Sequence, residues 1–181
     1  MKIKRIFLDL DGVVRDWCEG MRLKYGIDFP DEQIDNWDWV TRLVTSYNKI
    51  TEKEFWDAQG EDFWVGLQKT KDADEIISMC EDKCPDNVYI LTAPTLNNAG
   101  WSQQWIRKNM PSYFHAKKYL IGPPKYVCAN KTSLLIDDKE DNINQWYDEG
   151  GLTFLYPQPW NQGRGLAHVA VDELKDFLEI A

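Results

Sequence analysis

The sequence predicts an α/β protein with an open parallel sheet, helices on both faces of the sheet, and a small helical insertion after the first strand. Three observations predict it. Short apolar runs recur along the chain, helical stretches separate the later runs, and one long segment after the first run breaks the alternation. At 181 residues and 43% hydrophobic content, the chain can form one core domain that carries a small insertion.

Five apolar runs are the expected strands. They are short, and they are rich in Ile, Leu, Val and aromatic residues, as buried parallel strands are. The runs are residues 3–8, 88–91, 119–121, 134–136 and 152–156. The helical stretches that follow or separate the later runs are residues 72–83, 100–109, 141–148 and 171–180.

Residues 15–71 do not follow this alternation. They are rich in Trp and Asp, and they have helical or irregular patterns with no convincing strand. We therefore expect residues 1–14 and 72–181 to form a Rossmann-like core. Residues 15–71 would form a helical cap over the carboxyl ends of the strands, which is the edge where open α/β sheets bind ligands.

Charge and composition limit the class of partner. The formal net charge is −9, which argues against binding a nucleic-acid polymer because such binding needs a basic surface. No apolar run approaches the roughly 18 residues that span a bilayer, and no signal peptide is evident. The four cysteines are too few and too unevenly spaced for a disulfide framework. We expect a cytoplasmic protein that binds a small molecule and no membrane.

Acidic residues follow two of the predicted strands. Asp9 and Asp11 come after the first strand, with Gly12 allowing a sharp turn, and Asp137 and Asp138 come after the fourth. Four carboxylates that converge on one sheet edge would repel each other unless a cation neutralised them. Oxygen ligands of this kind suit Mg²⁺, which can also bridge to the oxygens of a phosphate.

Neutral and basic groups follow other strands. Thr92 and Ala93 end the second strand, where a hydroxyl and backbone N–H groups can meet a phosphoryl oxygen. Lys125 precedes the strand that leads to Asp137. A lysine at that place can neutralise phosphate charge and keep a carboxylate ionised.

In this order, Asp-Leu-Asp-Gly, Ile-Leu-Thr, Lys and Leu-Ile-Asp-Asp resemble the four motifs of the haloacid dehalogenase (HAD) superfamily of phosphohydrolases. Within it, the chain looks most like the 5'(3')-deoxyribonucleotidases. The stretches that carry the resemblance are 9–17 (DLDGVVRDW), 61–64 (EDFW), 90–94 (ILTAP), 101–108 (WSQQWIRK) and 134–142 (LLIDDKEDN). The resemblance implies a HAD-like fold and a small phosphomonoester substrate.

The resemblance also implies a role for each motif residue. Asp9 would attack phosphorus and form an aspartyl-phosphate, and Asp11 would act as general acid and base. Asp9, the backbone carbonyl of Asp11, and one or both of Asp137 and Asp138 would hold Mg²⁺. Four further residues would assist. The phosphoryl group would be bound by Thr92, Ala93 and Lys125, and the acidic loop would be supported by Asn142.

Two departures from the family pattern affect the expected phosphate site. The basic residue that the family has in the helix after the threonine motif falls near Ser102 in this chain. One of the residues that bind the phosphate in the family is therefore missing here, or its role is taken by a residue from elsewhere in the chain. The stretch 125–137 is also slightly longer than in the relatives, and it contains Lys131 as a second candidate for the phosphate-binding lysine.

Aromatic residues are unusually frequent, and nine of them are tryptophans. In the cap they either fill a thin core or form a slot that stacks on a flat ligand such as a nucleobase. Trp17, Phe63 and Trp64 are the expected slot residues. We therefore expect a phosphatase for nucleoside 5'-monophosphates, preferentially deoxyribonucleotides. The alternatives are a phosphatase for a sugar phosphate or other small phosphometabolite, and a binding module without catalysis. The fold leaves surface free for a homodimer.

Overall fold

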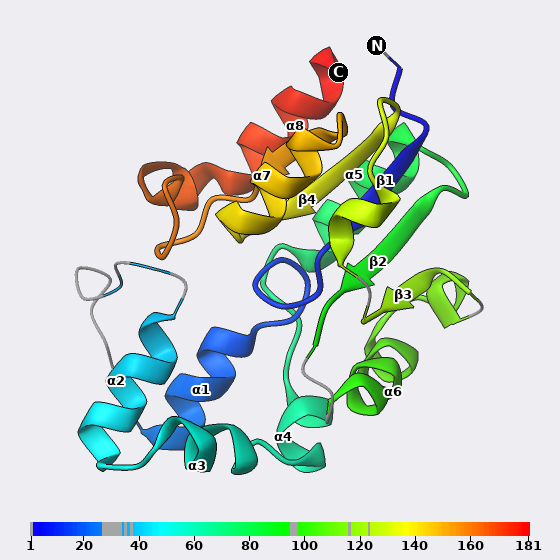
Figure 1. Ribbon diagram of the computed structural model, residues 1–181. Coiled ribbons are helices and arrows are strands. Elements are labelled where there is room, and N and C mark those ends of the chain that lie inside the picture. Colours follow the sequence, from blue (N-terminus) through cyan, green and yellow to red (C-terminus); the bar gives the residue numbers. More distant parts are fainter. Residues whose placement is uncertain are drawn as a thin grey trace.

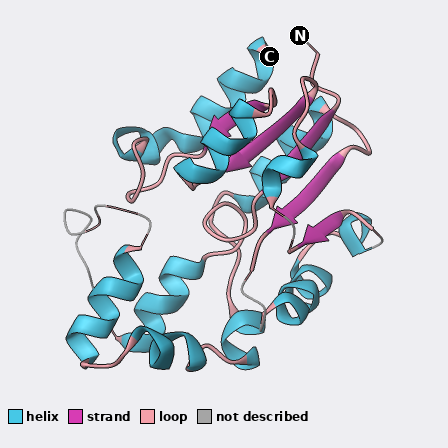
Figure 2. Cartoon of the chain, viewed as in Figure 1, coloured by secondary structure: helices cyan, strands magenta, loops and turns pink. Residues whose placement is uncertain are grey.

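The computed structural model describes residues 2–26, 34, 36, 38–94, 98–115, 117–122 and 124–181. Within them, one five-stranded sheet has the order β3-β2-β1-β4-β5, and every neighbouring pair is parallel (Figure 2). The strands are β1 (Arg5–Leu8), β2 (Val88–Thr92), β3 (Tyr119–Ile121), β4 (Ser133–Asp137) and β5 (Leu152–Leu155). The predicted α/β class with a parallel sheet is confirmed, and each predicted strand corresponds to one strand of the structure.

The central strands are apolar on both faces because both faces are covered. In β1, Ile6 and Leu8 belong to the larger of two hydrophobic clusters, while Phe7 belongs to the smaller one. Leu134 and Leu135 of β4 divide in the same way. Successive side chains of a strand point to opposite faces, so a continuous apolar run is what a sheet buried on both sides requires.

Helices cover the two faces. On the face of the larger cluster, α5 (Ala73–Lys83) packs against α8 (Ala170–Ile180). On the other face, α7 (Glu140–Asp148) packs on β4 and β5 and buries Trp146 in the smaller cluster. The remaining helix of the core, α6 (Ala99–Asn109), contacts β3. Each of these four helices begins within one residue of its predicted start.

Four helices lie between β1 and α5, beyond the carboxyl ends of the strands (Figure 1). They are α1 (Trp17–Tyr25), α2 (Trp39–Asn48), α3 (Glu52–Asp57) and α4 (Glu61–Gly66). Large rings fill much of the space between them: Trp39, Phe55 and Trp64 are all at most 5% exposed. Trp37, which belongs to the same aromatic-rich stretch, lies outside the described residues.

The two segments where the chain enters and leaves this helical region lie side by side and are hydrogen-bonded to each other. Arg15 and Lys69 form an antiparallel bridge. Beside it, the Asp16 N–H donates to the Gln68 carbonyl and the Thr70 N–H donates to the Val14 carbonyl, each at 2.9 Å. The insertion therefore begins and ends at one place on the sheet edge. None of the helices in the described residues has the length and apolarity that crossing a bilayer would require.

The strand order fixes where polar residues meet. After β1, the chain builds β2 and β3 on one side and then crosses to β4 and β5 on the other. The register pairs Leu8 with Ile136, so Asp9 and Asp137 follow at the same level of two adjacent strands. A reversal of strand order at the carboxyl edge leaves a crevice where ligands bind in open α/β sheets.

We predict that Gly151→Ala destabilises the protein. A Cβ at Gly151 would lie 2.1 Å from Nε1 of Trp146, whose ring is fully buried and packs 5.4 Å from the ring of Phe7. Overpacking of this kind lowers the free energy of unfolding by about 1–3 kcal/mol, which urea denaturation measures. The matched control is Gly100→Ala in α6, where an added Cβ meets no atom within 4 Å. Equal stability of the two variants would contradict the prediction.

Candidate active site

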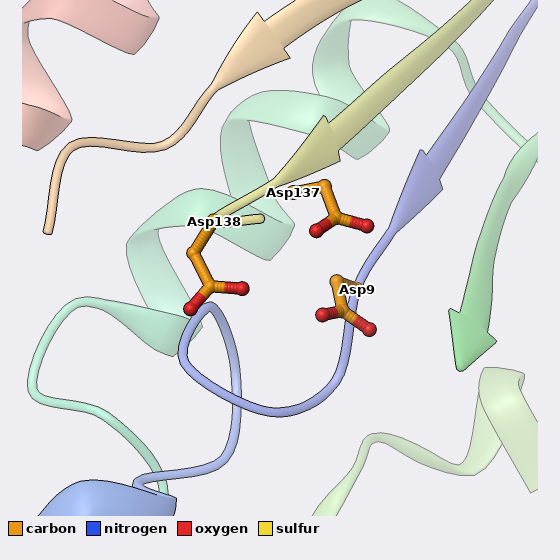
Figure 3. Close-up of side chains that lie close together, drawn as sticks. All are labelled: Asp9, Asp137 and Asp138. Atoms are coloured by element: carbon orange, nitrogen blue, oxygen red, sulfur yellow. The ribbon is translucent and has the colours of Figure 1, made fainter. Parts of the chain in front are cut away.

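Three carboxylates meet at the carboxyl edge of β1 and β4 (Figure 3). Asp9 directly follows β1, Asp137 is the last residue of β4, and Asp138 comes next. Each offers an oxygen, and these oxygens all lie within 4.8 Å of one another. All three residues are buried, with exposures of 8%, 0% and 3%. We call them the acidic cluster.

The fourth acid of the sequence prediction is oriented differently. The Asp11 carboxylate accepts from Arg15, with Nε donating to Oδ1 at 2.7 Å and Nη2 donating to Oδ2 at 2.8 Å. The expectation that four carboxylates converge is therefore corrected to three. The loop turns after Asp9 instead of continuing as a strand, so Asp11 does not share the face of Asp9. The expected metal contact of Asp11 used its backbone carbonyl and is not affected.

Lys125 bridges two members of the acidic cluster. Its Nζ lies 2.6 Å from Oδ1 of Asp9 and 2.6 Å from Oδ2 of Asp137. The residue is buried at the start of the 3₁₀ helix Lys125–Cys128, which packs against α7. The other candidate, Lys131, is exposed in the turn before β4. The geometry therefore favours Lys125 as the lysine of the site.

Burial and mutual repulsion change the protonation of the cluster. Burial raises the pKa of Asp9 to about 7, with Lys125 opposing the shift and Asp137 adding to it. Burial, together with the charges of Asp9 and Asp137, raises the pKa of Asp138 well above its usual range. Burial alone would lower the pKa of Lys125, but the charges of Asp137 and Asp9 outweigh it and raise this pKa. Asp9 and Asp138 are therefore harder to ionise than exposed carboxyl groups, and Lys125 stays charged.

Neighbouring residues hold the carboxylates of β4 in place. Asn142 donates from Nδ2 to both oxygens of Asp137, at 3.1 and 3.0 Å, which agrees with the expected supporting role of Asn142. Trp160 donates from Nε1 to Oδ2 of Asp138 at 2.7 Å. Gly12 is required beside it, because its φ is +84° and an added Cβ would lie 2.3 Å from Oδ2 of Asp138.

The acidic cluster fits a hard divalent cation. With all groups ionised, three carboxylates and the single ammonium of Lys125 leave an excess of two negative charges. Oδ1 of Asp138 is buried and has no hydrogen-bond partner among the described residues. A buried acceptor without a donor is costly, and a cation would satisfy it. A bound cation would also favour the charged forms of Asp9 and Asp138 and lower both pKa values again.

A cavity of about 160 Å³ lies against the acidic cluster. We call it the acidic cavity. Its lining residues are Asp9, Asp11, Thr92, Ala93, Lys125, Lys139 and Asn142. The predicted residues Thr92 and Ala93 come from the end of β2 and the loop after it, so three neighbouring strands supply the walls. The cavity brings two carboxylates, a hydroxyl group and two lysines together around one small volume.

A second cavity, of about 100 Å³, is lined mainly by indole rings. We call it the tryptophan cavity. Its lining residues are Asp11, Gly12, Trp17, Trp56, Trp64, Ala93, Pro94, Asn98, Asp138 and Trp160. The expected slot residues Trp17 and Trp64 are among them, whereas Phe63 is not. Phe63 lines a different depression, because successive residues of a helix point about 100° apart and Trp64 takes the inward position.

The two cavities meet at Asp11 and Ala93, which line both. On its other side the tryptophan cavity adjoins an outer cavity of about 520 Å³, and the two share Trp56, Trp64 and Asn98. Asn98 is 3% exposed, and its Oδ1 has no hydrogen-bond partner among the described residues. A ligand can therefore extend from the acidic cluster, past Asp11, along a wall of indole rings.

Sequence reasoning missed several residues of this site. Trp56, Asn98, Lys139 and Trp160 line the cavities, and Arg15 binds Asp11. Two signals could have found some of them. Trp160 lies in the loop after the fifth strand, at the same edge as the acids, and Arg15 is four residues after Asp11. Nothing in the sequence pattern separates Trp56 or Asn98 from core and helix-start residues.

Comparisons with known proteins agree with this geometry. A HAD family hydrolase from Deinococcus radiodurans R1, solved with bound phosphate and sodium, is 14% identical with a TM-score of 0.60, over 97% of this chain and 95% of that one. A haloacid dehalogenase-like hydrolase from Streptococcus pneumoniae is 13% identical with a TM-score of 0.59, over 97% and 98%. At these identities the likeness shows the fold alone.

At the level of sequence, no curated protein matches the chain. The sequence model of one family does match it, over residues 2–168. That family is described as "5' nucleotidase, deoxy (Pyrimidine), cytosolic type C protein". The match covers far more than half of the 181 residues. The chain therefore belongs to this deoxy 5'-nucleotidase family, and it is a phosphatase with the fold of HAD family hydrolases.

Proposed function

We propose that the protein is a Mg²⁺-dependent phosphatase that hydrolyses nucleoside 5'-monophosphates, preferentially deoxyribonucleotides, through an aspartyl-phosphate intermediate. The observation that carries this proposal is the junction of the two cavities at Asp11 and Ala93. The phosphoryl group would occupy the acidic cavity and the nucleoside the tryptophan cavity. The scissile bond would then lie beside Asp11.

The phosphoryl oxygens would be bound from several directions. Thr92 offers its hydroxyl, and Lys125 and Lys139 offer ammonium groups in the same cavity. Asp9, the backbone carbonyl of Asp11, and Asp137 or Asp138 would hold Mg²⁺. When bound, Mg²⁺ neutralises the excess negative charge and acts as a Lewis acid toward the phosphoryl oxygens.

Hydrolysis would take two displacements. In the first, an oxygen of the Asp9 carboxylate forms a bond to phosphorus while the bond from phosphorus to the 5'-oxygen breaks, and Asp11 gives its proton to that oxygen. In the second, Asp11 takes a proton from water as the water oxygen attacks phosphorus. The bond between phosphorus and Asp9 breaks, which releases inorganic phosphate and restores both carboxyl groups to their starting forms.

The tryptophan cavity supports a nucleotide over a sugar phosphate. Four indole rings line it, and Trp17 stacks on Trp56 with centroids 6.4 Å apart. Indole faces stack on flat rings, whereas sugar hydroxyls need many polar partners. Asn98 supplies a buried, unpaired acceptor that a base N–H could fill. Membership of the deoxy 5'-nucleotidase family supports the deoxyribonucleotide preference.

Residues 15–71 would act as the cap of this enzyme, on a core of residues 1–14 and 72–181. Three of the four tryptophans of the tryptophan cavity, Trp17, Trp56 and Trp64, come from α1, α3 and α4. The phosphate-binding residues come from the sheet edge. Residues of the core would therefore carry out the chemistry, and residues of the cap would select the substrate.

We predict that Asp9→Asn lowers kcat at least about a thousandfold, because the amide cannot act as the nucleophile. The substitution is isosteric and removes a buried carboxylate whose pKa is raised, so the melting temperature stays equal or rises. Phosphate release and thermal melting measure the two effects. Asp148→Asn on the exposed side of α7 is the matched control and keeps full activity. Activity of Asp9→Asn within tenfold of wild type would refute the covalent mechanism.

We also predict the order of substrates in a phosphate-release screen. Deoxyribonucleoside 5'-monophosphates should have the highest kcat/KM, followed by ribonucleoside 5'-monophosphates and then sugar phosphates. Stacking is worth about 1–3 kcal/mol per base, so the advantage over sugar phosphates should be about tenfold or more. If sugar phosphates are hydrolysed ten times faster than nucleotides, the nucleotide assignment is wrong and the phosphatase acts on another small phosphometabolite.

The hydrogen bond from Trp160 to Asp138 should determine metal affinity. Trp160→Phe keeps an aromatic ring but removes the donor, so we expect about tenfold weaker Mg²⁺ binding, as for other residues that orient metal ligands. Calorimetric titration and the Mg²⁺-dependent rise in melting temperature measure it directly. Trp56→Phe, in the same cavity but without a hydrogen bond to the acidic cluster, is the control. Unchanged Mg²⁺ affinity in Trp160→Phe would contradict this role.

A further inference from the structure

A buried arginine binds the proposed acid and base of the reaction. Arg15 is 0% exposed, and its guanidinium makes a two-point contact with the carboxylate of Asp11. The same Nη2 lies 3.4 Å from the hydroxyl oxygen of Ser102 in α6. Ser102 is the position at which the sequence resemblance expects a basic residue. A positive charge is therefore present at this place, and it comes from the loop after β1.

Two indole rings surround the guanidinium. Its Cζ lies 5.0 Å from the ring centroid of Trp64 in α4 and 5.6 Å from that of Trp105 in α6. Trp105 is itself fixed, because its Nε1 donates to the Leu67 carbonyl at 2.8 Å. Arg15 Nη1 is buried without an acceptor among the described residues, so the negative faces of the indole rings compensate part of its lost hydration.

Arg15 does not touch the space that a substrate would occupy. It lines neither the acidic cavity nor the tryptophan cavity, although two of its four partners do: Asp11 lines both cavities, and Trp64 lines the second. An arginine sealed from the cavities cannot bind a phosphate directly. It can act on a bound substrate only through Asp11 and Trp64.

We propose that Arg15 is a positioning residue. It fixes the Asp11 carboxylate at the junction of the two cavities and connects it to Trp64, which lines the tryptophan cavity. This inference rests on the proposed function, because it assigns Asp11 the proton transfers. The two-point contact fixes both the position and the plane of the carboxylate. Each carboxylate oxygen uses one lone pair to accept from Arg15. A second lone pair remains for the proton that Asp11 gives to the leaving group and later takes from water.

A positioning role has a signature that a purely structural role lacks. An alkoxide leaving group needs a proton as its bond to phosphorus breaks, whereas p-nitrophenolate leaves without one. Misplacing Asp11 should therefore slow the transfer of the phosphoryl group to Asp9, which kcat/KM reports, much more for an alkyl phosphate than for p-nitrophenyl phosphate. Damage to the fold, to the metal site or to the nucleophile would slow both substrates equally.

The experiment is Arg15→Lys, measured on the best alkyl phosphate substrate of the screen and on p-nitrophenyl phosphate. Lysine keeps the positive charge but lacks the planar fork that binds both oxygens. We expect kcat/KM for the alkyl phosphate to fall about tenfold or more, and kcat/KM for p-nitrophenyl phosphate to fall at most about threefold. The ratio kcat/KM is compared because kcat also includes hydrolysis of the aspartyl-phosphate, which is the same step for both substrates. The control is Arg22→Lys, since Arg22 also lies over a tryptophan, Trp39, at 5.9 Å.

A double variant identifies the residue through which Arg15 acts. Arg15→Lys combined with Asp11→Asn should be no slower than Asp11→Asn alone, because coupled residues are not additive. An equal fall for both phosphates, or additive losses in the double variant, would overturn the proposal. The proposed function fails separately, if nucleotides are poor substrates in the screen. The comparison of leaving groups then still holds for whichever alkyl phosphate is hydrolysed.

Discussion

The ammonium of Lys125 lies between Asp9 and Asp137, and the rest of the site depends on this contact. An unpaired carboxylate in a protein interior costs several kcal/mol, so three of them could not be buried together without a cation. One lysine provides part of the compensation, and with all three carboxylates ionised two negative charges would remain in excess. Burial and mutual repulsion raise the pKa values of Asp9 and Asp138 and so oppose full ionisation. A divalent ion favours the ionised forms, and a phosphoryl group can then enter beside acids that would otherwise repel it.

The sheet makes this concentration of charge tolerable. All strands are parallel and the central ones are covered on both faces, so the cluster lies at the end of two buried strands, β1 and β4. Backbone groups also contribute, because the N–H of Lys139 donates to Asp137 at 2.9 Å and that of Leu10 donates to Asp9 at 2.7 Å. Side chains on such a scaffold need little reorganisation when charge develops at phosphorus.

Much of this arrangement could be predicted from the sequence, because it follows from one rule: parallel strands bring their carboxyl ends to one edge. The apolar runs located β1 and β4, and so Asp9 and Asp137 were expected together. The same rule does not decide between Lys125 and Lys131, because neither lysine lies at the carboxyl end of a strand.

The orientations of individual side chains could not be predicted, because tertiary contacts determine them. Asp11 turns to Arg15 because the loop closes back on itself, with the Gly12 N–H donating to the Arg15 carbonyl at 2.9 Å. Phe63 and Trp64 are adjacent in the sequence, and only the packing of α4 against α6 decides which ring faces the cavity. Trp160 is a hydrogen-bond donor to Asp138 only because β5 lies next to β4.

Two acids of the site are each connected to the inserted helices through an aromatic ring. Asp11 is bound by Arg15, which lies over Trp64 of α4. Asp138 is bound by Trp160, which stacks on Trp39 of α2 with centroids 6.5 Å apart. In each pair of contacts, the hydrogen bond to the carboxylate is charge-assisted and contributes about 1.5–3 kcal/mol.

The aromatic contacts of the two pairs differ in strength. The ring pair of Trp160 and Trp39 contributes about 0.5–1.5 kcal/mol, whereas a desolvated cation over a ring, such as the buried Arg15 over Trp64, contributes about 2 kcal/mol or more. The connection from Asp11 to α4 is therefore about equally strong at both of its contacts. The connection from Asp138 to α2 is weakest between the two rings, so a displacement of α2 would break that contact before it disturbed the carboxylate of Asp138.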